Sequence, residues 1–265
     1  MTPDERVRVC MTVAGSDSGG GAGIQADLKA FARCGVHGTC AITAITAQNT
    51  VGVELVTQVP GPTIVAQIHA VAEDMPIDAV KVGMLGDEAT IDAVVEALTL
   101  VGDAPVVVDP VMVSASGAIL LDRNAKAALI ERVLPLATVA TPNVPEAREL
   151  AGLGEGAGGA ELARAIQALG PEAVVVTGGH SDDGADVLYD GSGTVHIDGP
   201  RYAAAASHGS GCTHSSALAA FLARGVELVE AARWAREIAS EAVGKGLVGI
   251  GSGAGPVDAI GIIRP

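Results

Sequence analysis

Short apolar runs alternate along the chain with stretches in which apolar residues recur at helical spacing. In the clearest of these stretches, Ile24, Leu28 and Phe31 fall at positions i, i+4 and i+7 while polar residues fill the other faces, which predicts an amphipathic helix. Apolar runs of strand length occupy residues 7–14, 38–47, 79–82, 105–109, 138–140 and 173–177. Because strands that alternate with helices are typical of βαβ units, the pattern predicts an α/β fold with a mostly parallel central sheet.

The last third of the chain has a different pattern. A turn at Gly191-Ser192-Gly193 between two apolar runs predicts a hairpin over residues 186–197, and helical stretches follow at about residues 211–224 and 227–245. Residues 249–256 contain too many glycines for a helix or strand and are expected to form a loop. No internal repeat or long linker interrupts the sequence, so we expect residues 1–265 to form a single domain.

Composition narrows the classes of function. Every apolar run is interrupted before 18 residues, so no membrane-spanning helix is expected despite a mean hydropathy of +0.41. The net charge is −15, and Lys and Arg form no run, which argues against a nucleic-acid partner. Four widely spaced cysteines and an N-terminus without a secretory signal predict a cytoplasmic protein with reduced thiols. The expected partner is a small molecule, and if it is anionic, metal ions and backbone N–H groups must offset the repulsion.

A glycine-rich segment lies directly before the first C-terminal helix. In Ser207-His208-Gly209-Ser210-Gly211-Cys212-Thr213, successive N–H groups at a helix start are suited to hold an anion, such as a phosphoryl group in transfer. A flexible connector with a Ser or Thr helix cap explains the same residues. Cys212 is expected to have a lowered pKa, which suits a catalytic base, unless it is a small buried thiol. The segment lacks the G-x-S-x-G spacing of an esterase nucleophile.

Two acidic residues follow predicted core strands. Asp109 stands at the carboxyl end of its strand, where ligands of open α/β sheets bind, and is a candidate to orient Mg²⁺; an Asp-Pro turn is the alternative. Asn143 and Glu146 have the spacing of a helix N-cap and its reciprocal partner. Glu146 adds a second carboxylate near the same metal only if it also faces the crevice at the sheet edge.

The first predicted strand is followed by a second glycine-rich segment at residues 15–23. Within it, Gly21-Ala22-Gly23-Ile24-Gln25-Ala26 matches the G-x-G-x-x-A pattern of a dinucleotide fold, so a nicotinamide-dependent oxidoreductase is an alternative. Against it, the second predicted strand ends in Gln48-Asn49 without the acidic residue that binds a dinucleotide ribose. Asp27 on the following helix either points at the site or is a solvated helix charge.

Six segments taken together strongly resemble the hydroxymethylpyrimidine/phosphomethylpyrimidine kinases, in that family's order and over nearly the whole chain. They are residues 14–29, 44–50, 81–85, 109–112, 143–147 and 208–213. Gly20 to Asp27, and a Gly-x-Gly-Cys where sugar kinases have Gly-x-Gly-Asp, are the specific signals. The resemblance implies a three-layer α/β/α ribokinase-like fold, usually a homodimer. It also implies that ATP, with Mg²⁺, phosphorylates 4-amino-5-hydroxymethyl-2-methylpyrimidine and then its monophosphate, in thiamine diphosphate biosynthesis.

The resemblance further implies roles for individual residues. Gln48 is expected to hydrogen-bond the edge of the pyrimidine ring, and the pocket around the ring is expected to be shaped by Gly15, Asp27 and Met84. Mg²⁺ is expected to be bound by Asp109 and Glu146, and ATP by Asn143, Thr177 and Gly179. The anion hole is expected to be formed by Gly209, Ser210 and Gly211, and Cys212 is expected to be the catalytic base.

Two departures from the family pattern modify these expectations. Thr177 stands where some members have a lysine, so Mg²⁺ and the anion hole must offset more of the phosphate charge. Ser18 follows Asp17 where a proline is common, so the loop there is expected to be more mobile. A mobile flap is also predicted at Ser114-Ala115-Ser116-Gly117. A pyridoxal kinase, and a pyrimidine-binding protein without catalysis, remain alternatives.

Overall fold

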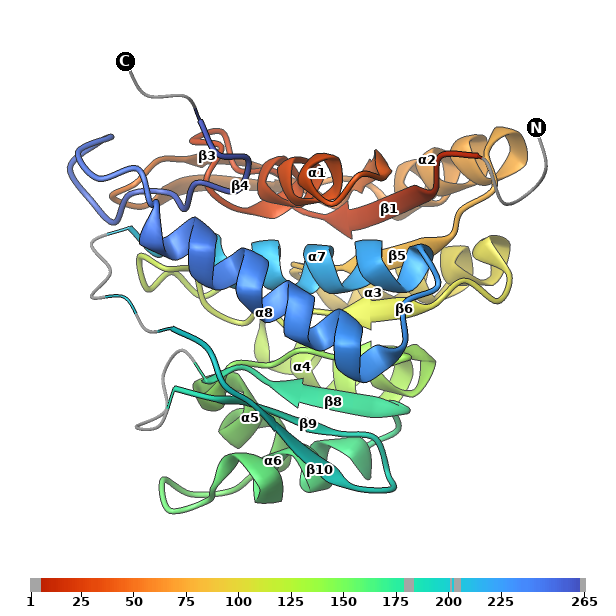
Figure 1. Ribbon diagram of the computed structural model, residues 1–265. Helices are drawn as coiled ribbons and strands as arrows, with labels where there is room; N and C mark the ends of the chain where they lie inside the picture. The colour runs from red at the N-terminus through yellow and green to blue at the C-terminus, as the bar shows by residue number, and fades with distance from the viewer. Residues whose placement is uncertain (1–5, 179–183, 201, 203–205, 263–265) are drawn as a thin grey trace.

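The main sheet forms the centre of the molecule (Figure 1). The structure is a computed structural model that describes residues 6–178, 184–200, 202 and 206–262. Within those residues the sheet has the order β10-β9-β8-β7-β6-β5-β1-β2, parallel from β2 to β8 and antiparallel at β9 and β10. The strands are β1 (Val9–Ala14), β2 (His37–Ile42), β5 (Ala79–Val82), β6 (Val106–Val108), β7 (Val139–Ala140), β8 (Ala173–Val176), β9 (Asp186–Tyr189) and β10 (Thr194–Ile197).

Helices cover both faces of this sheet. One face carries α1 (Gly23–Arg33), α7 (Ser210–Ala223) and α8 (Leu228–Gly244), and the other carries α2 (Gly61–Asp74), α3 (Glu88–Leu98), α4 (Arg123–Ala128), α5 (Val144–Ala151) and α6 (Gly159–Gln167). Strand residues alternate between the two cores: Val107 packs with α7, whereas Val106 and Val108 pack on the opposite side. The predicted three-layer α/β/α fold is therefore confirmed.

Helix α7 is buried around most of its circumference because it lies between the sheet and α8 (Figure 1). Its buried positions are mainly Ala and Ser, small side chains that allow close approach of the neighbouring elements. The glycine-rich segment before α7 is consequently held at the carboxyl edge of the parallel strands. The two predicted C-terminal helices and the hairpin at residues 186–197 are confirmed to within one or two residues.

The prediction of one strand over residues 38–47 is wrong. Parallel pairing of β2 stops at Ile42 because its neighbour β1 ends at Ala14. Thr43 is buried and donates its hydroxyl to the Met84 carbonyl at 2.8 Å, and the chain then leaves the main sheet. It continues as β3 (Ala44–Gln48), which pairs antiparallel with β4 (Val53–Gln58) in a separate two-stranded sheet that the apolar pattern did not predict.

Two further expectations concern loops and membranes. Residues 249–256 contain no helix or strand, as predicted. In the described part of the chain, no helix combines the length and apolar character needed to cross a membrane.

Candidate active site

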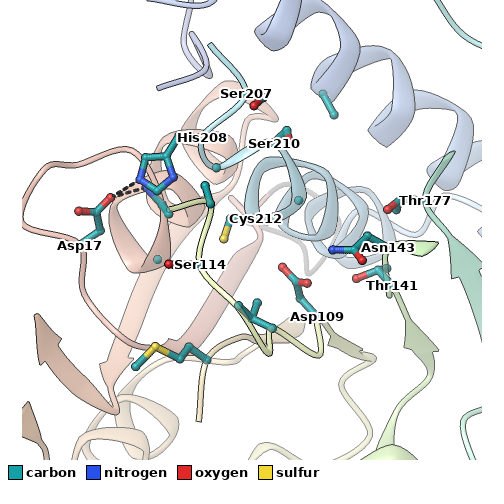
Figure 2. A pocket seen from close by; sticks show the side chains of 18 of the residues that line it. Asp17, Asp109, Ser114, Thr141, Asn143, Thr177, Ser207, His208, Ser210 and Cys212 are labelled. Carbon is teal, nitrogen blue, oxygen red and sulfur yellow. Dashed lines mark hydrogen bonds and ion pairs between the residues drawn. The ribbon is translucent and has the colours of Figure 1, made fainter. Parts of the chain in front are cut away.

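One cavity of about 720 Å³ opens at the carboxyl edge of the parallel strands. Figure 2 shows Cys212 and Asp109 between the Asp17–His208 pair on one side and the side chains of Asn143 and Thr177 on the other. Its wall brings together most of the residues singled out from the sequence: Gly15, Gln48, Met84, Asp109, Asn143, Glu146, Thr177, Gly209, Ser210, Gly211 and Cys212. Of the other two, Gly179 lies outside the described residues, and Asp27 lies beneath the wall.

The anion loop, residues 207–211, leads into α7 without a side-chain cap. Gly209 at the N-cap position has a φ of +84°, a left-handed conformation that glycine adopts without strain. The alternative interpretation of this segment as a Ser or Thr cap is therefore wrong, because no side chain among the described residues accepts a hydrogen bond from the first turn. Uncapped N–H groups and the helix dipole give this edge of the cavity a positive potential.

Asp27 and Lys81 form a fully buried ion pair below the cavity floor. Lys81 Nζ lies 3.0 and 3.1 Å from the two carboxylate oxygens of Asp27 and 3.8 Å from Asp109 Oδ2. Thr12 and Ser216 donate to the same carboxylate at 2.6 and 2.8 Å. Burial lowers the pKa of Lys81, but the carboxylates of Asp27 and Asp109 outweigh it and hold the pKa above its ordinary value. Asp27 is fully buried and does not line the cavity, and it contacts the site through Lys81. Its expected part in shaping the substrate pocket stays a prediction.

The expected low pKa of Cys212 is wrong for the unliganded protein. Burial raises the pKa of the Cys212 thiol to about 12. Lys81 opposes this increase, whereas Asp27 and Asp109 add to it. The helix-start argument fails here because desolvation and two nearby carboxylates exceed the effect of the helix dipole.

Two acidic side chains, Asp109 and Glu146, share the cavity wall. Burial and the neighbouring Asp109 raise the pKa of Glu146 to about 8. Burial also raises the pKa of Asp109, where Lys81 opposes and Asp27 adds to the effect. Among the described residues no group of three or more His, Cys, Asp or Glu could hold a metal by itself. Mg²⁺ commonly takes only one or two carboxylates and completes its shell with water and phosphate oxygens, so the residues present fit such an ion.

The start of α5 confirms the predicted helix cap and also turns Asn143 and Glu146 toward the cavity. Asn143 Oδ1 accepts from the Glu146 N–H, and Glu146 Oε2 accepts from the Asn143 N–H, both at 2.9 Å, which is a capping box. Both side chains also line the cavity. Thr177 is brought beside them because its N–H donates to the Pro142 carbonyl at 2.9 Å.

The opposite end of the cavity is built from the first glycine loop, residues 15–23, and the end of β3. A side chain at position 15 would meet Met84 Cε at 3.0 Å, so the glycine leaves room for Met84 in the wall. Ser18 accepts from the Gln48 N–H at 2.8 Å and donates to the Gln48 carbonyl at 2.7 Å. The residue that replaces the common proline therefore ties the loop directly to Gln48.

Sequence reasoning missed three side chains of this site: Asp17, Lys81 and His208. Lys81 is a lysine inside a predicted core strand, a position where an unpaired charge is costly, and this signal indicated a buried partner. Asp17 and His208 are 191 positions apart, and nothing in their local patterns indicated that they pair at 2.9 Å.

The fold and the site define a small-molecule kinase of the ribokinase-like class, a phosphotransferase. A family model described as phosphomethylpyrimidine kinase matches residues 17–258, and the chain belongs to this family. The hydroxymethylpyrimidine/phosphomethylpyrimidine kinase of Rhizobium meliloti is 46% identical over 255 residues, which cover 94% of this chain and 96% of the relative.

Two solved structures are similar over most of the chain. The phosphomethylpyrimidine kinase of Clostridium difficile is 42% identical, with a TM-score of 0.76 over 86% of this chain and 96% of the other. The pyridoxal kinase of Bacillus subtilis, solved as an ADP complex, is 36% identical, with a TM-score of 0.87 over 95% of this chain and 97% of the other. The chain belongs to a family of kinases, whose phosphoryl donor is ATP. The two alternatives of a nicotinamide-dependent oxidoreductase and of a binding protein without catalysis are therefore wrong.

Proposed function

We propose that this protein phosphorylates 4-amino-5-hydroxymethyl-2-methylpyrimidine to its monophosphate and then to its diphosphate, using ATP and Mg²⁺, in thiamine diphosphate biosynthesis. The observation that carries the proposal is the single cavity in which the uncapped start of α7, Cys212 and the Asp109–Glu146 pair meet. The family match and the 46% identical relative support the pyrimidine over pyridoxal.

The acceptor is assigned to the end of the cavity at Gln48. We expect the Gln48 amide to hydrogen-bond the ring edge, because it can both donate and accept as an aminopyrimidine edge requires. Gly15 and Met84 complete the wall on this side.

The phosphates of ATP are assigned between the anion loop and the start of α5. In this assignment Gly209 and Gly211 direct their N–H groups toward a transferring phosphoryl group. The Ser210 N–H donates to the Ser207 carbonyl at 3.1 Å, so Ser210 shapes this anion hole rather than donating its N–H into it. Asn143, Thr177 and Gly179 contact the nucleotide. Asp109 and Glu146 would hold Mg²⁺, which neutralises phosphate charge when bound. In a chain of net charge −15, this local compensation is required for an anionic donor.

Cys212 is assigned as the base for the first phosphorylation only. Its thiol is protonated in the unliganded protein, since its pKa is about 12. Asp109, once neutralised in the loaded site, no longer raises that pKa, while Lys81 continues to lower it. The hydroxyl acceptor gains from proton removal, whereas a phosphate acceptor, with a second pKa of about 6, is already ionised near neutral pH.

A homodimer, a cytoplasmic location and a single kinase domain over residues 1–265 complete the proposal. Family resemblance supports the homodimer, and the reduced thiols support the cytoplasm.

The test is phosphate transfer from Mg²⁺-ATP by the purified protein, with mono- and diphosphate products resolved and pyridoxal assayed in parallel. We expect both pyrimidine products in sequence, loss of activity with a chelator, and its return on addition of Mg²⁺. Phosphorylation of pyridoxal alone, or no transfer by folded protein that binds ATP, would overturn the assignment.

A further inference from the structure

The two glycine-rich loops are joined across the cavity mouth by one buried pair (Figure 2). We propose that Asp17 and His208 are positioning residues that hold the first glycine loop and the anion loop in register, so that the acceptor oxygen meets the phosphoryl group rather than water. This inference rests on the proposed kinase function and adds two residues to it.

The Asp17 carboxylate accepts three backbone hydrogen bonds besides its contact with His208. Its Oδ1 accepts from the Gly19 N–H at 2.8 Å, and its Oδ2 accepts from the N–H groups of Gly21 and Ala22 at 2.9 and 2.8 Å. Burial raises the pKa of Asp17, but the bonds from His208 and the backbone outweigh it and hold the pKa below its ordinary value. An ionised carboxylate only accepts hydrogen bonds, so His208 Nε2, at 2.9 Å from Oδ2, is the donor.

Backbone packing makes the same connection. A Cβ at Gly209 would lie 1.8 Å from the Gly21 carbonyl oxygen, and a Cβ at Gly21 would lie 2.3 Å from the His208 ring. The backbone of His208 is also held by the C-terminal loop: its N–H donates to the Gly255 carbonyl at 3.2 Å, and its carbonyl accepts from the Val257 N–H at 3.0 Å. The loops thus touch without an intervening side chain, and the pair sets their relative position.

The two loops serve different reactants. The first glycine loop presents Gly15 beside Gln48 and Met84, and the anion loop presents the uncapped start of α7. In the productive reaction, the acceptor oxygen bonds to the γ-phosphorus as the bond to the ADP oxygen breaks, and the acceptor loses its proton. If the loops separate, a water oxygen can take the acceptor's place, and the products are ADP, inorganic phosphate and a proton.

The test compares ATP consumed with phosphoryl groups transferred to the pyrimidine, counting one for each monophosphate and two for each diphosphate. It is made in the wild-type protein and in His208→Ala, His208→Gln and Asp17→Asn. This ratio does not depend on the fraction of folded enzyme, so a purely structural defect leaves it unchanged. We expect His208→Ala to raise it by about 5- to 100-fold, since a misplacement of about 1 Å can cost about 100-fold in rate. Gln at position 208 retains an N–H donor and should restore most of the coupling.

The matched control is His196→Ala, an exposed histidine on β10 that lies outside the cavity wall and should keep the wild-type ratio. A wild-type ratio in His208→Ala would overturn the inference even if the turnover number falls, and so would equal ratios in the Ala and Gln variants. Absence of pyrimidine phosphate from the wild-type protein would overturn the proposed function instead, and the same ratio with pyridoxal would then decide on the positioning pair.

Discussion

Replacing Lys81 by methionine removes the ammonium group that lies between two buried carboxylates while keeping most of the side-chain volume. Asp27 keeps its bonds from Thr12 and Ser216 but loses its cation, and Asp109 loses a positive charge at 3.8 Å. Breaking one side of a buried ion pair costs about 3–5 kcal/mol of unfolding free energy. At about 2–4 °C per kcal/mol for a chain of this size, the melting temperature should fall by about 6–20 °C.

The assay is thermal and urea unfolding of Lys81→Met, Asp27→Asn and the double variant at pH 7 and low ionic strength. The double variant removes both charges of the Lys81–Asp27 pair and leaves only Asp109 without its nearby cation, so its loss should be clearly smaller than the sum of the two single losses. A loss below about 1 kcal/mol in Lys81→Met, or additive losses in the double variant, would refute the account of Lys81 as a paired cation.

Three further predictions concern the cavity. Cys212→Ala should slow the first phosphorylation by about 10²- to 10⁴-fold and the second much less, as measured with each acceptor separately; equal losses would make Cys212 positional. Ser18→Ala removes both bonds to the Gln48 backbone, and pyrimidine binding must then order Gln48 at a cost of about 1 kcal/mol, which should raise the KM for the pyrimidine about fivefold; an unchanged KM in steady-state assays would contradict this. Glu146 has a raised pKa, so its contribution to stability is present at low pH and is lost as the pH rises from about 4.5 to about 8. Glu146→Gln should therefore gain melting temperature relative to the wild type at pH 8 but not at pH 5, and equal gains at both would count against the shift.

Much of the layered fold was predictable because the parallel core strands are short, mainly apolar runs and α1 has a clear amphipathic period. The separate β3–β4 sheet was not, because residues 38–47 are equally apolar on both sides of Thr43. The end of pairing there depends on the length of β1, which is a tertiary property.

Within the site, the sequence identified residues at strand ends and helix starts, where position alone implies the cavity edge. It failed for Cys212, because the pKa depends on burial and on carboxylates from distant segments. It also failed for the Asp17–His208 pair, because a contact between residues 191 positions apart produces no recognisable pattern in the sequence around either residue.

The two-stranded sheet has a consequence for how relatives of this protein can diverge. Gln48 lies at the end of β3, outside the eight-stranded sheet whose edge carries Asp109 and Thr177. Ile45 and Leu55 on this small sheet are 56% and 60% exposed, so substitutions there disturb little of either core. In the proposed assignment of the acceptor to Gln48, acceptor preference can change through this small sheet while the edge of the eight-stranded sheet stays the same. Pyridoxal and pyrimidine kinases both occur among structures of the same shape.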